Sequence, residues 1–150
     1  MKPVHILLVE DNEGDILLTK EVFAEMKLNI QFSVVRDGKE AEEFLNREGK
    51  YAAETLPDLL LLDINLPKKN GHEVLQHVKR TDFLKHIPVI MLTTSSSEKD
   101  INFCYLNYAS CFITKPNDVD EFISVVGAIE NFWLSAVRLP AIKANSHEKR

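Results

Sequence analysis

Short apolar runs alternate with amphipathic segments along the whole chain. The runs have the length and the apolar or β-branched composition of buried strands, and they cover residues 4–9, 30–35, 59–62, 89–92 and 111–114. Apolar residues at helical spacing predict helices over about 12–27, from 41, around 74–78, up to about 107 and from 118 to about 137. Nearly continuous apolar strands that alternate with helices predict an α/β fold, in which helices cover both faces of a parallel sheet.

Two of these helices show clearly which face should be buried. In the first helix the apolar face is formed by Ile16, Leu17, Val22 and Phe23. In the last helix a stripe at helical spacing is formed by Val119, Phe122, Val126, Ile129 and Trp133. We expect both faces to pack against the sheet.

Charged side chains follow three of the predicted strands. Glu10 and Asp11 come directly after the first strand, Asp63 after the third and Lys115 after the fifth. Ligands of such folds bind beyond the carboxyl ends of the strands, near the point where the strand order reverses. We therefore expect three carboxylates and one ammonium group at one edge of the sheet, an arrangement that suits a divalent cation and a phosphoryl group.

The acids predict a magnesium site and a nucleophile. Neighbouring carboxylates repel one another unless a cation neutralises them, and Mg²⁺ prefers hard oxygen ligands. Asp11 and Asp63 would bind the ion directly, Glu10 through water or by orienting a ligand, and the backbone carbonyl of Asn65 is a further candidate ligand. Asp63 can also attack an activated phosphoryl group and become an aspartyl phosphate.

The other candidate residues would support this chemistry. The Lys115 ammonium can neutralise phosphoryl charge, and a cis bond before Pro116 would fix its direction. Thr93, at the end of the fourth strand, can donate its hydroxyl to a phosphoryl oxygen. Each residue also has a structural interpretation: a helix cap at Asp11 or Asn12, a turn cap at Asp63, a surface position for Lys115, the start of a cap at Thr93 and a core position for Phe112.

Composition and charge narrow the class of protein. The chain has 150 residues, enough for one domain with a real core, and its net charge of -5 disfavours nonspecific binding to nucleic acid. No apolar run approaches the ~20 residues that span a bilayer, and the N-terminus lacks a signal-peptide pattern. The two cysteines lack the spacing of a redox pair, which favours a reducing compartment. We expect a cytoplasmic protein without a membrane segment.

With Glu10-Asp11, Asp63, Thr93 and Lys115-Pro116 in this order, residues 4–138 resemble the receiver domain of two-component response regulators. The resemblance implies a flavodoxin-like, doubly wound sheet of five parallel strands in the order 2-1-3-4-5. It also implies that Asp63 accepts a phosphoryl group from a histidine kinase with Mg²⁺, and that the domain catalyses its own phosphorylation and dephosphorylation. Asn65 and Ser95 would line the approach of water.

The same resemblance assigns a switch and shows two departures from the family. Thr93 would move toward the phosphoryl group while the ring of Phe112 turns inward. Receivers often have tyrosine where Phe112 stands. They also commonly place glycine at the exit of the fourth helix, where this chain has Asn107-Tyr108-Ala109, so the conformation of that loop is left open.

A narrower likeness concerns the partner. The segments around Glu10, Asp63 and Lys115, and the Phe132-Trp133-Leu134 end of the last helix, look like the small stand-alone receivers paired with bacterial phytochrome histidine kinases. The resemblance therefore implies a phytochrome-type kinase. We expect the receiver to cover residues 1–138, a polar tail to cover 139–150, and no output domain to follow.

Without an output domain, the signal would pass to other proteins through the surface of the receiver. Val125, Phe132 and Ala136 flank the core stripe of the last helix, and such a flank is either wider core or a protein contact. We expect a homodimer through this helix, including Phe132 and with the fourth helix and fifth strand as possible additions.

Three alternatives remain open at this point. A haloacid-dehalogenase-like phosphohydrolase would carry Asp-x-Asp after its first strand, whereas Asp63-Ile64-Asn65 follows the third and offers no second acid. A flavodoxin-like FMN module would place hydroxyl, glycine and amide groups after strand one, where Glu10-Asp11 instead places negative charge. A degenerate receiver would keep the fold and act as a binding module.

Overall fold

The computed structural model describes residues 3–26 and 28–142. Within them, five parallel strands form one sheet in the order β2-β1-β3-β4-β5, the order that the resemblance implies. The strands are β1 (Val4–Val9), β2 (Ile30–Val35), β3 (Leu59–Leu62), β4 (Val89–Thr93) and β5 (Cys111–Thr114). The helices are α1 (Glu13–Ala24), α2 (Gly38–Leu45), α3 (Gly71–Arg80), α4 (Glu98–Leu106) and α5 (Val119–Glu130), with a 3₁₀ turn at Gly49–Tyr51 and a π-helical turn at Asn131–Ala136.

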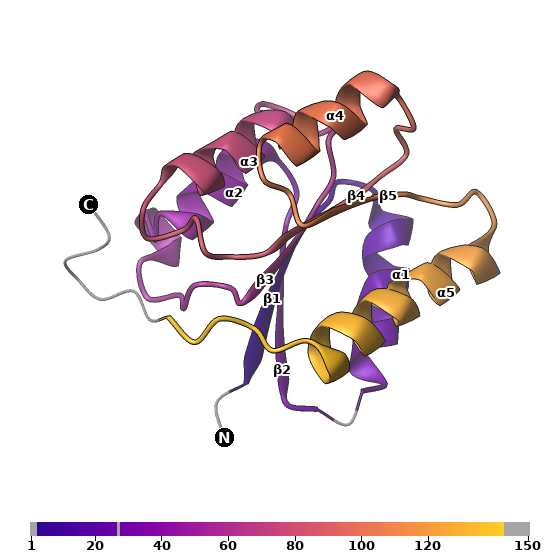
Figure 1. The fold of residues 1–150 in the computed structure, drawn as a ribbon. Coiled ribbons are helices and arrows are strands. Elements are labelled where there is room, and N and C mark those ends of the chain that lie inside the picture. The colour runs from indigo at the N-terminus through magenta and orange to yellow at the C-terminus, as the bar shows by residue number, and fades with distance from the viewer. Residues whose placement is uncertain (1–2, 27, 143–150) are drawn as a thin grey trace.

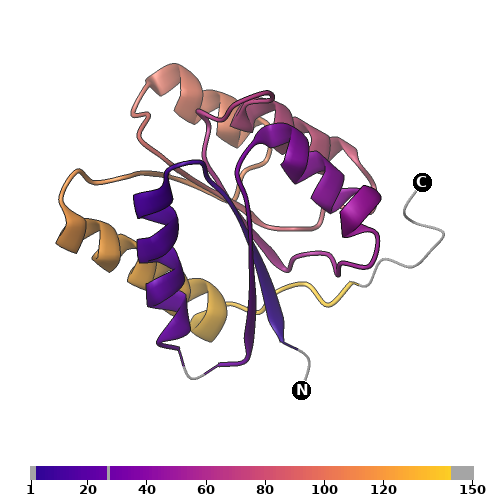
Figure 2. The same ribbon diagram turned by 180° about the vertical axis from the view of Figure 1, so that it is seen from behind.

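Helices cover both faces of the sheet. Helices α2, α3 and α4 lie on one face and α1 and α5 on the other (Figures 1 and 2). Alternate residues of each strand belong to two separate hydrophobic cores. In β3, Leu60 and Leu62 pack toward α2–α4, whereas Leu59 and Leu61 pack toward α1 and α5. All four of these leucines are fully buried. The apolar run of β3 is thus explained by burial on both sides.

The predicted buried faces are correct except at two residues. Leu17 is 58% exposed and Val119 is 55% exposed. In α1 the inward positions are Ile16, Thr19 and Phe23, and Thr19 is accommodated there because its hydroxyl donates to the Asp15 carbonyl at 2.7 Å. Val119 is the first residue of α5. It stays exposed because the packing of this helix against the core begins at Phe122.

Polar side chains at the helix starts set where each helix begins. The side chain of Asn12 accepts from the Asp15 amide, and Ser97 accepts from the Asp100 amide. Asp37, Asn70 and Asp118 cap α2, α3 and α5 in the same way. Asn12, not Asp11, therefore caps α1, which leaves the Asp11 carboxylate free for another role.

The turn before β5 contains an unusual residue for its conformation. Tyr108 has φ of 68°, in the left-handed region that favours glycine. Its amide donates to the Tyr105 carbonyl and the Ala109 amide donates to the Cys104 carbonyl, each at 3.0 Å, the paired bonds of a Schellman motif. The turn therefore forms its hydrogen bonds without a glycine, and Tyr108 adopts the left-handed conformation at the position where receivers commonly have glycine.

The structure also answers three smaller questions from the sequence. Cys104 packs in the core beneath α2–α4 and Cys111 packs against the opposite one, which agrees with two small apolar residues rather than a redox pair. Among the described residues no peptide bond is cis, so the expectation for Pro116 is wrong. In the same part of the chain no helix combines the length and apolar character needed to cross a bilayer.

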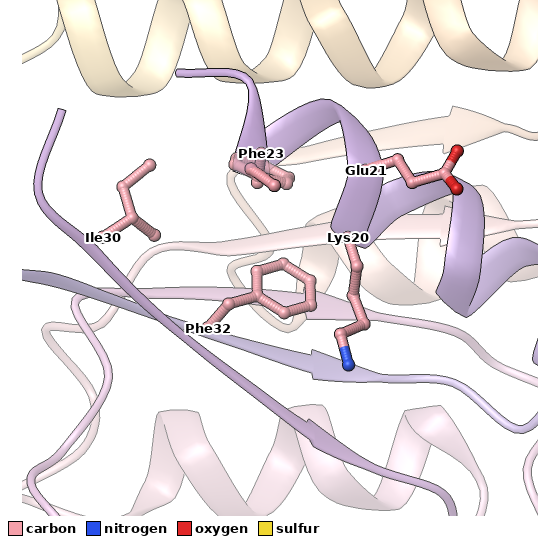
Figure 3. Close-up of a pocket in the computed structure, with 6 residues that line it drawn as sticks. Lys20, Glu21, Phe23, Ile30 and Phe32 are labelled. Carbon is pink, nitrogen blue, oxygen red and sulfur yellow. The ribbon is translucent and has the colours of Figure 1, made fainter. Parts of the chain in front are cut away.

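An apolar pocket of about 320 Å³ lies between α1 and the edge strand β2 (Figure 3). The rings of Phe23 and Phe32, 5.4 Å apart between centroids, form much of its wall together with Ile30. It adjoins the last turns of α1 and the first residues of β2, at the amino ends of the strands. The charged groups that follow the strands lie at the opposite edge of the sheet.

Candidate functional site

Three carboxylates meet where β1 and β3 end. Oxygen atoms of Glu10, Asp11 and Asp63 all lie within 4.8 Å of one another. The parallel register pairs Val9 with Leu62, so the residues that follow them, Glu10 and Asp63, leave the sheet side by side. Both are buried, whereas Asp11 is exposed. The sequence predicted this convergence from the strand ends alone.

Lys115 reaches into the same cluster from the end of β5. Its ammonium donates to Glu10 Oε1, to Asp15 Oδ2 at 3.0 Å and to Asp63 Oδ2 at 3.5 Å. Its backbone amide donates to the Thr93 carbonyl at 2.7 Å, which continues the β4–β5 ladder and directs the side chain inward. Only 4% of the side chain is exposed, so the interpretation of Lys115 as a surface lysine is wrong.

The charges in the cluster are not balanced. Burial raises the pKa of the Glu10 carboxyl to about 7, and the nearby Asp63 carboxylate adds to this, although the hydrogen bond from Lys115 acts in the opposite direction. Burial lowers the pKa of the Lys115 ammonium, but its hydrogen bond and charge interaction with Glu10, and the charge of Asp63, outweigh burial and leave the pKa raised. A buried carboxyl that resists ionisation beside two further acids fits a cation-binding site, because a divalent cation would favour the ionised form.

Asp63 is held at both of its carboxylate oxygens. Oδ1 accepts from the Ile64 amide at 2.7 Å, and Oδ2 is the atom that faces Lys115. Gly71, at the start of α3, lies directly against the Asp63 backbone, and its amide donates to the Ile64 carbonyl at 2.8 Å. The exposed Asn65 stands in the loop between these residues. Backbone packing thus fixes the position from which the Asp63 carboxylate projects.

The two candidate switch residues lie on neighbouring strands. Thr93 is fully buried at the end of β4, and its hydroxyl accepts from the Ser95 amide at 3.4 Å. Phe112, in the edge strand β5, is half-buried and packs against the core beneath α2–α4. Its amide donates to the hydroxyl of Tyr105 at 3.1 Å. A tyrosine from α4 therefore covers the free edge of the strand that carries the switch phenylalanine.

Side chains from three elements hold the loop that follows Thr93. The Ser95 hydroxyl donates to Asp100 Oδ2 at 2.6 Å, and the Thr114 hydroxyl donates to the Ser95 carbonyl at 2.9 Å. His72 Nε2 lies 3.2 Å from Asp100 Oδ1, and the His72 ring stacks on Phe103 with centroids 4.1 Å apart. The loop is thereby connected to α3, α4 and β5, a linkage that single-residue patterns in the sequence did not reveal.

Asp15 is the site residue that sequence reasoning missed. It lies in the first turn of α1, three residues after the cap Asn12, and its carboxylate contacts Lys115 across 100 positions of sequence. Its place in the helix that directly follows Glu10-Asp11 was the available signal. Because the sequence does not show how closely α1 approaches the end of β5, nothing distinguished Asp15 from an acidic residue at a helix N-terminus.

Comparison with known proteins now decides the family. The model of the response regulator receiver domain matches residues 6–127. The chain belongs to the response regulator receiver family. It is 42% identical over 139 residues to Response regulator Rcp1 of Synechocystis sp., covering 93% of this chain and 95% of Rcp1. Family membership decides against the phosphohydrolase and FMN alternatives.

Solved receivers resemble this structure closely. The phosphorylated cyanobacterial phytochrome response regulator RcpA has a TM-score of 0.91 and 45% identity, covering 93% of this chain and 100% of RcpA. The Mn²⁺-bound form of Rcp1 also has a TM-score of 0.91, with 42% identity and coverage of 93% and 100%. Receivers bind a divalent metal, one of these relatives was solved with one, and this receiver presents the acidic cluster for it.

Proposed function

We propose that this receiver accepts a phosphoryl group on Asp63 from the phosphohistidine of a phytochrome-type histidine kinase. The observation that carries the proposal is the buried Lys115 ammonium, which lies between Glu10, Asp15 and Asp63 at the carboxyl edge of the sheet. A buried lysine beside a fixed carboxylate and a cluster of acids provides a nucleophile and a charge-neutralising group in one place.

The transfer involves one bond formed and one bond broken at phosphorus. A carboxylate oxygen of Asp63 attacks the phosphorus, the P–N bond of the phosphohistidine breaks, and its electron pair returns to the imidazole nitrogen. Water later attacks the aspartyl phosphate, which releases inorganic phosphate and restores the carboxylate. The receiver thus catalyses its own modification and its reversal, and it acts on no separate substrate.

Glu10, Asp11 and Asp63 would hold Mg²⁺, and the backbone carbonyl of Asn65 is a further proposed ligand. When bound, the ion supplies neutralisation of phosphoryl charge. The raised pKa of Glu10 supports this assignment, since the buried acid needs a positive neighbour beyond Lys115 to be fully ionised near neutral pH. Lys115 would pair with a phosphoryl oxygen in exchange for part of its present contact with Asp63.

Thr93 and Phe112 are the proposed switch. A move of the Thr93 hydroxyl toward a phosphoryl oxygen requires the following loop to shift, and that loop is held by Ser95, Asp100 and Thr114. Inward rotation of the half-buried Phe112 ring would fill the space left behind. Ser95 and Asn65 are proposed to line the approach of water, and the bond from Ser95 to Asp100 sets where the Ser95 hydroxyl stands.

The phytochrome assignment rests on similarity to RcpA, which is named as a cyanobacterial phytochrome response regulator. It is tested by mixing the receiver with a phytochrome histidine kinase labelled on its histidine with radioactive phosphate. We expect the label to pass to the receiver within minutes and not to Asp63→Asn. Persistent label on several such kinases, with the receiver folded and able to accept phosphoryl from a small donor, would contradict this partner.

We further propose that the receiver domain covers residues 1–138, followed by a polar tail over 139–150, and that it acts in the cytoplasm. The two unpaired cysteines agree with a reducing compartment. Leu139–Ile142 lie near Pro3, Val4 and Asp58 around a shallow pocket. The rest of the tail, residues 143–150, lies outside the described part of the chain.

A homodimer through the last helix is also proposed. Phe132 is 56% exposed and meets Trp133 edge-to-face at 5.8 Å between ring centroids, whereas Val125 packs with the core. Phe132→Glu is expected to convert the dimer to a monomer in sedimentation velocity, because a buried unpaired carboxylate is costly. Leu28→Glu, at a residue that is 46% exposed and precedes β2, is the control. An unchanged dimer in Phe132→Glu would remove the helix from the interface.

A further inference from the structure

We propose that Asp15 is a positioning residue for Lys115, which it holds at the margin of the site when a divalent cation occupies Glu10 and Asp63. The inference rests on the proposed function and adds a residue to its machinery. Lys115 has three carboxylate partners, Glu10, Asp15 and Asp63, of which the ion would claim two.

The ammonium and a divalent cation compete for the same carboxylates. Glu10 and Asp63 are partners of Lys115 and also members of the acidic cluster. Asp15 is a partner of Lys115, at 3.0 Å, but is not part of that cluster. When the ion takes up Glu10 and Asp63, Asp15 is therefore the carboxylate that continues to neutralise the buried ammonium.

Asp15 is fixed in a way that suits this role. Its amide donates to Asn12 Oδ1 at 2.9 Å, and its carbonyl accepts from the Thr19 hydroxyl at 2.7 Å. The first turn of α1 is therefore anchored at both ends around this residue. The Asp15 side chain is 27% exposed, whereas that of Lys115 is 4% exposed, so Asp15 approaches the buried ammonium from the margin of the site.

Removal of the Asp15 charge should leave the Lys115 ammonium paired with Glu10 and Asp63, the carboxylates that would bind the ion. In Asp15→Asn the ammonium depends on Glu10 and Asp63 alone, so it competes with Mg²⁺ and covers the attacking carboxylate. We expect Mg²⁺ affinity, measured by calorimetry, to fall about tenfold, the scale of one charge-assisted hydrogen bond. Phosphorylation of Asp63 by acetyl phosphate at subsaturating Mg²⁺ should slow by a similar factor. Asp15→Glu keeps the charge and should restore most of the affinity.

Two comparisons separate positioning from simpler explanations. Glu13→Gln removes a carboxylate from the same helical turn, but Glu13 pairs with Arg36 at 2.7 Å, so it should leave Mg²⁺ affinity within about twofold. In a Lys115→Met background, Asp15→Asn should have little effect, because the residue on which Asp15 acts is gone. An equal loss of affinity in that background would overturn the proposal and make Asp15 a bare charge near the ion.

Failure of this proposal is distinguishable from failure of the proposed function. If the parent chain forms the Asp63 adduct and Asp15→Asn matches it in Mg²⁺ affinity and rate, the positioning role is wrong and the function stands. A fall in thermal stability with unchanged Mg²⁺ affinity would reduce Asp15 to a tether between α1 and the end of β5. Mg²⁺ affinity reads out the role of Asp15 even if the parent chain forms no adduct.

Discussion

Gly71→Ala is expected to lower the free energy of unfolding by about 3 kcal/mol and to impair phosphorylation of Asp63. A Cβ atom at position 71 would lie 2.1 Å from the Asp63 carbonyl oxygen and 2.7 Å from Ile64 Cα. Both neighbours are backbone atoms, so the clash cannot be relieved by a side-chain rotation. Either α3 moves away from β3 or Asp63 is displaced from the cluster. Urea denaturation and the rate of adduct formation measure the two effects.

Gly127 provides the matched control for this substitution. It lies within α5, and a Cβ built there meets no atom within 4 Å. Gly127→Ala should therefore raise stability by about 0.5–1 kcal/mol, because alanine loses less conformational entropy than glycine in a helix. Gly71→Ala with stability and adduct formation equal to the parent chain would show that the tight contact between α3 and Asp63 is not needed.

Lys115→Met is expected to slow phosphorylation of Asp63 by about 10²–10³-fold, the scale for losing one charged donor at a reacting group. The same change should tighten Mg²⁺ binding, because it removes a positive charge that contacts Glu10 and Asp63. The opposite directions of the two effects are diagnostic. A variant that merely unfolded would lose both properties together. Adduct formation and calorimetry on the same preparation measure them.

Lys79→Met is the control for loss of a half-buried lysine. Lys79 donates to the Lys85 and Ile87 carbonyls at 3.0 and 2.7 Å, at the end of α3 and away from the acidic cluster. It should change stability but leave the phosphorylation rate close to that of the parent chain. A Lys115→Met variant that phosphorylates at the parent rate would contradict the role assigned to Lys115.

The sheet was predictable because its signals are local. Four strands are apolar runs and β2 alternates with β-branched residues, and charged residues follow three of the strands, so the strand bounds and the convergence of Glu10, Asp63 and Lys115 could be inferred from the sequence. The strand order was not derivable from the runs and came from resemblance to receivers. Thr93 was predicted to stand at the end of the fourth strand, and it is the last residue of that strand, where it continues the register with Thr114.

The contacts that sequence could not supply are tertiary ones between distant residues. The pairing of Asp15 with Lys115 depends on how α1 approaches the end of β5. The contact of His72 with Asp100 depends on the packing of α3 against α4. Leu17 was predicted to be buried, but it is exposed and Thr19 takes the buried position. Thr19 can do so because its hydroxyl forms a hydrogen bond within the helix. In each case the sequence gives the residue type, and the packing of elements decides its partner.

The role of Asp63 as phosphoryl acceptor is tested by the intact mass of the protein after incubation with a small acyl phosphate, with Mg²⁺ and with a chelator. Asp63→Asn is measured beside the parent chain. The geometry around Asp63 and Lys115 predicts one phosphoryl adduct that requires both Mg²⁺ and Asp63. A folded parent chain without an adduct in any condition would contradict this role and favour a receiver that acts only as a binding module. An adduct that persists in Asp63→Asn would also contradict it, because another residue would then be the acceptor.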